Sequence, residues 1–334
     1  MTCNIYSAEP AHPVLAHSLL SEPRPTTIDQ PIHGPTTNDW DLKDDWTTGL
    51  GVSKDGVFRS GTIIGFSRLR NRSSDSDEYV GQLPRYLLTE YLRKNPPSSE
   101  ANTFIIYPSF SDAFAARTLL TSLQSGPSPL SREDAMKRLD CVQLYPVQNL
   151  PDAAQAIKQV SELLQQAEEN RQLSDQAASP IYPAIILVVV GLDTLAEGII
   201  RTSNTARGSA VLASTLRALT RMSRTHGSLL SILLVNTSGL GSSPFDAGQD
   251  TSSGRAAMIG SGENDTRPSN HDGIHSIFQL PGSQVLSTLL MRTLDQGIDT
   301  HILLSDVKYA RVAEVIKDRT GTGLGKWGIW SPPR

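Results

Sequence analysis

Two short apolar runs on either side of an arginine-rich segment constrain this chain more than any other feature. Residues 184–190 are apolar without interruption, and residues 229–235 are apolar except for one serine. Each run is too short to span a bilayer and too uniformly apolar for a half-exposed antiparallel strand. The pattern predicts two central strands of a parallel sheet, buried on both faces, with a basic helix between them.

A carboxylate closely follows the first apolar run. Asp193 and Thr194 come after residues 184–190, and Asn236 ends the second run. Parallel strands end at the same edge of a sheet, and doubly wound α/β proteins bind ligands at that edge. Asp193 is therefore a candidate for chemistry, although Asp is also a common helix cap. Both interpretations stay open at this point.

The rest of the chain alternates between strand and helix patterns. Further strands are expected within 56–66, 103–107 and 141–145, and helices at 78–94, 111–123 and 151–169. Strands that alternate with helices form the crossover units of a mainly parallel sheet. Late strands are expected at 300–304, 311–317 and 326–330. The last two alternate in polarity, which predicts an antiparallel extension of the sheet.

The composition indicates one core diluted by less ordered segments. Hydrophobic residues make up 38% of the chain, and Ser, Thr, Pro and Gly are plentiful. Residues 1–45 lack hydrophobic periodicity and are expected to form a disordered arm. Residues 46–331 are expected to form the core domain. Within it, a Gly/Ser-rich insertion at about 238–276 is expected to be a flexible loop.

The charge and the cysteines exclude several classes of protein. The net charge of -4 excludes a surface that is basic throughout, so nucleic-acid binding would need a local patch. Cys3 and Cys141 are the only cysteines, which excludes a disulfide scaffold and fits a reducing compartment. We expect no membrane span and no signal peptide, and therefore a cytosolic or nuclear protein.

The segment 198–226 is basic and contains no Asp or Glu. Arg217, Arg221 and Arg224 have the spacing i, i+4, i+7, so they share one face of a predicted helix. Arg201 and Arg207 flank a small polar run that is expected to be a mobile loop. These five arginines are candidate nucleic-acid-binding residues. A solvated helix face is the other interpretation.

The segment after the first strand lacks a phosphate-binding motif. A P-loop needs G-x-x-x-x-G-K-[ST] between a strand and a helix, so that backbone N–H groups, Lys and a hydroxyl hold the phosphates and magnesium. Residues 67–77 offer Arg68, Arg70 and Arg72 in a polar loop instead. A hydrolase triad is not expected either, because no G-x-S-x-G elbow is present and the histidines show no spacing that requires a shared site.

The order of these parts resembles the core of the RecA-like recombinases and their eukaryotic paralogues. The likeness rests on Asp193-Thr194, on Arg201-Thr202 and Arg207-Gly208, on the helix that follows, and on Asn236. It covers about 51–330. It implies a RecA-like, P-loop-NTPase-type three-layer α/β core with a mainly parallel central sheet and antiparallel C-terminal strands.

The chain also departs from that family. The phosphate-binding motif is absent, Thr237 stands where active recombinases carry Gln, and no Glu follows the strand at 103–107. Hydrolysis needs those groups to position and neutralise the phosphates. The resemblance therefore implies a degenerate subunit without catalytic residues or a metal. Its vestigial nucleotide or metal site would consist of Asp193, Thr194, Asn236, Arg68 and Arg70, and no ATP or magnesium cofactor is assigned to it.

The leading hypothesis is a non-catalytic subunit similar to those of Shu-type complexes. Such a protein would be nuclear and would assist homologous recombination as part of a hetero-oligomer. Its partners would be single-stranded or branched DNA and other RecA-like paralogues or a recombinase filament. The five arginines, Arg201, Arg207, Arg217, Arg221 and Arg224, would neutralise phosphates.

Two alternatives remain. One is a structural subunit of an Elongator-like assembly, whose smaller subunits also look like RecA folds without phosphate loops and act in transfer RNA modification. The other is a DNA-dependent ATPase with an atypical phosphate loop. In that case Asp193 would hold magnesium, and Arg68 or Arg70 would replace the lysine.

Overall fold

The computed structural model describes most of the chain between Leu42 and Ser331. The described residues are 42–50, 56–69, 78–95, 102–125, 128–174, 184–241, 274–278, 285–307, 310–319 and 321–331. Nearly all of the predicted arm 1–45 and of the predicted loop insertion lies outside these ranges, as do Arg70 and Arg72. The first described element, helix α1, begins at Lys43, slightly before the predicted start of the core domain.

The described strands form a single eight-stranded sheet in the order β3-β2-β4-β5-β1-β6-β7-β8. Their bounds are β1 Ile63–Arg68, β2 Thr103–Pro108, β3 Val142–Val147, β4 Ile185–Val190, β5 Leu230–Val235, β6 Thr300–Val307, β7 Ala310–Asp318 and β8 Trp327–Trp330. Strands β1 to β6 pair in parallel, whereas β7 pairs antiparallel with both β6 and β8. The predicted antiparallel extension is confirmed.

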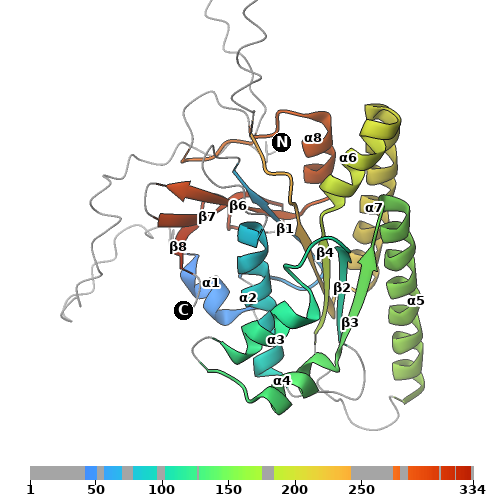
Figure 1. The fold of residues 1–334 in the computed structure, drawn as a ribbon, viewed down its shortest axis with the longest axis vertical. Coiled ribbons are helices and arrows are strands. Elements are labelled where there is room, and N and C mark those ends of the chain that lie inside the picture. The colour runs from blue at the N-terminus through green and yellow to red at the C-terminus, as the bar shows by residue number, and fades with distance from the viewer. Residues whose placement is uncertain are drawn as a thin grey trace, which may run out of the picture.

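Helices cover the sheet on both faces (Figure 1). Their bounds are α1 Lys43–Thr48, α2 Glu78–Lys94, α3 Ala116–Gln124, α4 Arg132–Leu139, α5 Leu150–Ser174, α6 Leu192–Thr202, α7 Thr205–Thr225 and α8 Leu289–Gln296. Helices α1 to α4 pack on one face and α5 to α8 on the other, each over its own apolar cluster. The result is a three-layer α/β core with a mainly parallel central sheet, as the sequence predicted.

The two apolar runs form the centre of the sheet. Every residue of β4 and β5 is buried, and the strands pair side by side in parallel with Val188 opposite Leu233. Strand β4 lies between β2 and β5, so both of its edges are hydrogen-bonded and both of its faces are covered by helices. This position explains why the sequence of β4 shows no alternation of polarity.

The prediction of a mobile loop between Arg201 and Arg207 is wrong. Helix α6 continues to Thr202, and α7 begins at Thr205, so only two residues connect them. The side chain of Asn204 accepts a hydrogen bond of 2.8 Å from the backbone N–H of Arg207 and caps α7. The small polar run that favours a loop in the sequence supplies a helix N-cap instead.

Gly65 and Gly198 test how tightly β1 is packed, because a side chain has no space at Gly65 and open space at Gly198. A Cβ at Gly65 in β1 would lie 2.4 Å from Ile298 Cδ1, whereas one at Gly198 in α6 meets nothing within 4 Å. We expect Gly65→Ala to lower the free energy of unfolding by about 1–3 kcal/mol through overpacking. Gly198→Ala should raise it by about 0.5–1 kcal/mol through helix propensity. Urea unfolding measures both. An unchanged Gly65→Ala protein would contradict the packing of Ile298 on β1.

Candidate functional site at the carboxyl edge of the sheet and along helix α7

Asp193 joins the ends of the two central strands. It lies in the first turn of α6, just after β4, and is only 2% exposed. Its Oδ2 accepts a hydrogen bond from the backbone N–H of Ser238, 2.5 Å away, and its Oδ1 accepts one from Thr237 Oγ1 at 3.3 Å. Thr194 Oγ1 and Thr237 Oγ1 also share a short hydrogen bond. Both carboxylate oxygens therefore connect the end of β4 with the segment after β5.

Burial makes the charge on Asp193 unfavourable. Desolvation raises the pKa of this carboxyl above its usual range, and hydrogen bonds from the backbone at Ser238 and Thr194 only partly offset that effect. A magnesium ion would have to compete with Ser238 and Thr237 for the same oxygens. The geometry thus favours a structural tie for Asp193 over a metal ligand.

A buried chain of hydrogen bonds begins at Asn236, at the end of β5. Asn236 Nδ2 donates to Ser67 Oγ at 2.8 Å, and Ser67 Oγ lies 2.8 Å from His301 Nε2. His301 Nδ1 lies 2.9 Å from Asp295 Oδ1, and Lys317 Nζ donates to Asp295 Oδ2 at 2.7 Å. These five side chains come from β5, β1, β6, α8 and β7.

Ser67, His301 and Asp295 meet in this hydrogen-bond chain, although their spacing in the sequence does not require a shared site. Ser67, His301 and Asp295 are arranged as in a hydrolase triad, and sequence spacing missed them because His301 is 234 positions from Ser67. All three are at most 4% exposed, so a substrate cannot reach Ser67. We therefore interpret the triad-like chain as a structural connection among five elements.

The buried ion pair at the end of this chain is balanced by its surroundings. Burial alone would raise the pKa of Asp295, but the hydrogen bond and charge of His301 and the charge of Lys317 hold that pKa below its ordinary value. Burial lowers the pKa of Lys317, and the adjacent Asp295 opposes that effect. The two side chains satisfy each other in the interior, as a buried pair must.

The candidate nucleotide residues are only partly brought together. Asp193 and Thr194 lie beside Thr237, the neighbour of Asn236, at the carboxyl edge of β4 and β5. Arg68 is the half-buried last residue of β1. Arg70 lies outside the described residues. Within the described part of the chain, no group of three or more Asp, Glu, His or Cys side chains is placed to hold a metal ion.

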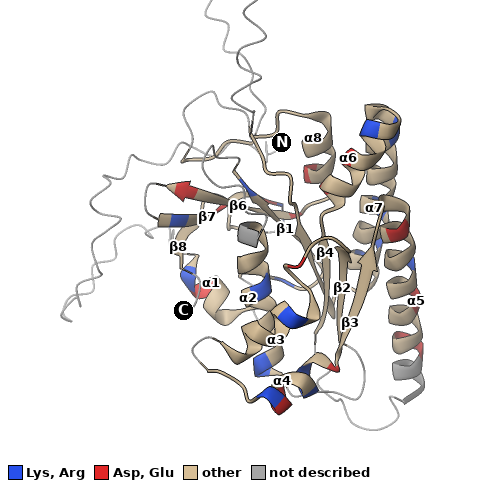
Figure 2. Ribbon diagram, in the orientation of Figure 1, with Lys and Arg blue, Asp and Glu red and all other residues tan. Residues whose placement is uncertain are grey.

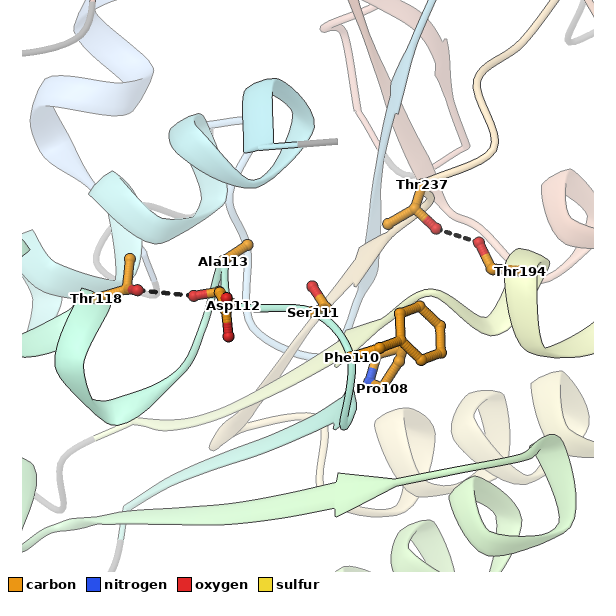
Figure 3. Close-up of a pocket in the computed structure, with 8 residues that line it drawn as sticks. All are labelled: Pro108, Phe110, Ser111, Asp112, Ala113, Thr118, Thr194 and Thr237. Atoms are coloured by element: carbon orange, nitrogen blue, oxygen red, sulfur yellow. Dashed lines mark hydrogen bonds between the residues drawn. The ribbon is translucent and has the colours of Figure 1, made fainter. Parts of the chain in front are cut away.

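A pocket of about 280 Å³ opens at the same edge, beyond the ends of β2, β4 and β5 (Figure 3). It is lined by Pro108, Phe110, Ser111, Asp112, Ala113, Thr118, Thr194 and Thr237. Its polar groups are hydroxyls and one carboxylate, and none of the lining residues is basic. Among the described residues no cation lines this pocket, so nothing described there replaces the missing phosphate loop.

Helix α7 presents a basic outer face. Arg207, Arg217 and Arg221 are exposed, while Leu212 and Leu219 on the opposite face pack into the apolar cluster under the sheet. Figure 2 shows basic positions also at the end of the layer where α6 meets α7. The rise of about 1.5 Å per residue places Arg207 and Arg221 about 21 Å apart along the helix.

The other two predicted arginines have ionic partners. Arg224 Nη2 lies 2.6 Å from Asp299 Oδ1, and its Nη1 donates to the carbonyl of Gly61, so it fastens α7 to the start of β1 and β6. Arg201 pairs with Glu197 one turn earlier, at 3.2 Å. Among the described residues, Arg207, Arg217 and Arg221 are in no ion pair.

Comparison with known proteins identifies no family for this chain. No family model matches the sequence, and no curated protein matches it. One solved structure to which the chain is similar is titled "Crystal structure of the RadB recombinase", with 11% identity and a TM-score of 0.43. The alignment covers 81% of this chain and 86% of the other. A likeness this weak supports no functional argument. In the described ranges, no helix has the length and apolar character that crossing a membrane requires.

The structural interpretation of Asp193 predicts different outcomes for two substitutions. Asp193→Asn can still accept from the Ser238 N–H, so we expect little loss of stability. Asp193→Ala leaves that N–H unsatisfied and should lower the free energy of unfolding by about 1–3 kcal/mol.

The raised pKa of Asp193 also predicts that the stability of the protein depends on pH in a way that Asp193→Asn removes. A raised carboxyl pKa means that the folded state binds the proton more tightly. The contribution of Asp193 to stability is therefore fully present below its unfolded pKa of about 3.9 and is lost as pH rises through the higher folded pKa. Asp193→Asn should lack this fall. Urea unfolding at a series of pH values from below the unfolded pKa upward measures this loss of stability. If Asp193→Asn and Asp193→Ala lowered the free energy of unfolding equally, the structural role of Asp193 would be contradicted.

Proposed function

We propose that this protein is a non-catalytic RecA-fold subunit that assists homologous recombination in DNA repair by binding DNA and partner proteins. The observation that carries the proposal is the line of exposed arginines on α7, on a helix without acidic residues. The proposal includes a nuclear location and a hetero-oligomer with other RecA-like proteins. Single-stranded or branched DNA would be the ligand.

The spacing of these arginines suits a sugar-phosphate backbone. Arg217 and Arg221 are one turn apart, and Arg207 extends the same face of α7 toward α6. Contacts of this kind provide affinity without sequence preference, and their strength falls steeply with salt. The segment 192–226 contains no aromatic residue on which bases could stack, so phosphate contacts would supply most of the affinity.

Acidic residues on the neighbouring helix α5 weaken this field only in part. Glu168 is paired with His226 at 2.8 Å, and Glu162 is paired with Lys158. A carboxylate that already accepts a hydrogen bond or pairs with a cation repels a nearby phosphate less than a free carboxylate does. Among the described surfaces, we therefore propose the exposed arginines of α7 as the one that binds a polyanion.

We propose that the protein does not hydrolyse ATP because the residues at the carboxyl edge of the sheet are engaged in structural hydrogen bonds. Ser67 and Asn236 face each other within the buried hydrogen-bond chain, and both oxygens of Asp193 hold the segment after β5. The sequence after β1 has no Gly-Lys-Ser/Thr. Positioned phosphate-binding groups supply nearly all of the catalysis in phosphoryl transfer, so a site without them is not expected to hydrolyse ATP.

Two alternatives share the same observations. The arginines of α7 could equally contact transfer RNA in an Elongator-like assembly, and identifying the proteins that co-purify with the tagged protein separates the two roles. An atypical ATPase is favoured only by Asp193 and Thr194, which lie at the expected edge. Calorimetric titration with millimolar ATP and magnesium, with Asp193→Asn as the control, tests it. Heat that Asp193→Asn abolishes would support the ATPase.

The DNA-binding proposal predicts a specific change in salt dependence. Replacing Arg207, Arg217 and Arg221 together by Ala should weaken binding to a single-stranded oligonucleotide. It should also reduce the slope of log K against log salt by about 2, since each phosphate contact on a single strand contributes about 0.7. Fluorescence anisotropy across a salt series measures both quantities.

A matched variant on the opposite layer serves as the control. Arg117, Arg132 and Lys137 are exposed on α3 and α4, so replacing them by Ala changes the net charge equally without touching α7. This control should keep most of the wild-type slope. Equal losses in both triple variants, or none in the α7 variant, would show that α7 is not the DNA-binding face.

A further inference from the structure

The pocket at the carboxyl edge has a position that the fold makes suitable for binding. After β2 the chain continues through α3 and α4 on one face to β3. After the adjacent strand β4 it continues through α6 and α7 on the other face to β5. Connections that leave neighbouring strands in opposite directions open a crevice at their carboxyl ends, which is where α/β proteins bind ligands. Pro108 and Thr194 line the pocket at this point.

The segment between β2 and α3 presents side chains that the fold itself does not use. The sequence predicts a helix over 111–123, but α3 begins at Ala116, and its N-cap Ala115 makes no side-chain hydrogen bond. Asp112 contributes only its backbone carbonyl, which accepts from Thr118 Oγ1 at 2.7 Å. Within the described residues, the carboxylate of Asp112 has no hydrogen-bond or ionic partner.

An exposed aromatic ring accompanies this carboxylate. Phe110 is 67% exposed, although it is a large apolar residue in a short connection. In Figure 3 its ring lies on the side of the pocket nearest Thr194, and Ser111 and Asp112 follow it along the rim. A ring face and a carboxylate beside one cavity offer both interactions that a guanidinium group makes, namely stacking and paired hydrogen bonds.

We infer that this pocket binds an arginine side chain of a partner protein. Its volume of about 280 Å³ is just below the range of about 300–1,000 Å³ that pockets for drug-sized ligands occupy, so a single side chain fits better than a nucleotide. Its acceptors, the Asp112 carboxylate and several hydroxyls, match a group that has only donors. Asp112 disfavours an anion. The inference concerns partner binding and does not depend on DNA contacts of α7.

Arginine is favoured over lysine by the shape of the pocket. The planar guanidinium can stack on an aromatic ring such as Phe110 and can form paired hydrogen bonds with a carboxylate such as Asp112, whereas an ammonium does neither. The ammonium of lysine is a compact and strongly hydrated charge. It would lose more hydration than a guanidinium on entering the pocket and would make fewer contacts there. The partner segment would therefore present an exposed arginine, and the pocket would select it by both charge and planarity.

The test uses three capped tripeptides, acetyl-Gly-X-Gly-amide, with X as arginine, lysine or citrulline. Citrulline has nearly the shape of arginine without its charge. Each peptide is titrated into the full-length protein, and the methyl resonances of Ala113, Thr118 and Thr237 are followed by NMR. We expect saturable shifts with the arginine peptide, weaker binding of lysine, and binding of citrulline that is weaker by about fivefold, the scale of an exposed ion pair.

Two substitutions and one control complete the design. Asp112→Asn and Phe110→Leu should each weaken the arginine peptide several-fold, and both positions are exposed enough to leave folding intact. Asp140→Asn removes the same charge from the exposed end of α4 and should change nothing. Equal binding of citrulline and arginine, no saturable shift, or an unaffected Asp112→Asn protein would overturn the inference. Because the α7 triple variant should still bind the peptide, failure of the DNA proposal would be recognised separately.

Discussion

The buried hydrogen-bond chain from Asn236 to Lys317 holds the centre of this molecule together. It passes through Ser67 and His301 to Asp295 and so connects four strands with α8. A buried polar group that loses its partner destabilises a protein by about 1–3 kcal/mol, so every member of the chain depends on its neighbours. The β5–β1–β6 region is therefore fixed by polar contacts as well as by apolar packing.

That constraint determines where function can reside. Ser67 and Asn236 lie near the carboxyl edge of the sheet, where α/β proteins bind ligands, yet Asn236 donates to Ser67 and Ser67 contacts His301. Asp193, at the end of the next strand, holds Ser238 and Thr237. Edge residues that maintain the fold are poorly placed to change partners during a reaction cycle. Within the part of the chain that the structure describes, the surfaces that we propose for binding are the outer face of α7 and the pocket beside Phe110.

Local patterns predicted the layers of the fold well. The uniform apolar runs gave β4 and β5, the late alternating segments gave β7 and β8, and the position of Asp193 after a buried strand placed it correctly at the edge. These features follow from burial and periodicity, which neighbouring residues in the chain report directly. The arm and most of the long insertion lie outside the described residues, so those expectations remain predictions.

Long-range contacts were beyond the reach of such patterns. Helical spacing grouped Arg224 with Arg217 and Arg221, but it could not indicate the ion pair with Asp299, which lies 75 positions away. The sequence did not indicate a partner for His301 because Ser67 lies in β1, which is 234 positions earlier in the chain. The pocket was missed for a similar reason, since Phe110, Thr194 and Thr237 come from three separate segments. Only the strand order brings such residues together.

Arginine footprinting tests the central claim, that the functional surface is the outer face of α7, most directly. The full-length protein is treated with an arginine-specific dicarbonyl reagent with and without a single-stranded oligonucleotide, and modified residues are quantified by mass spectrometry. The account predicts that DNA protects Arg207, Arg217 and Arg221 while Arg117 and Arg132 stay equally reactive. Protection elsewhere, with the three α7 arginines as reactive as in the free protein, would contradict it.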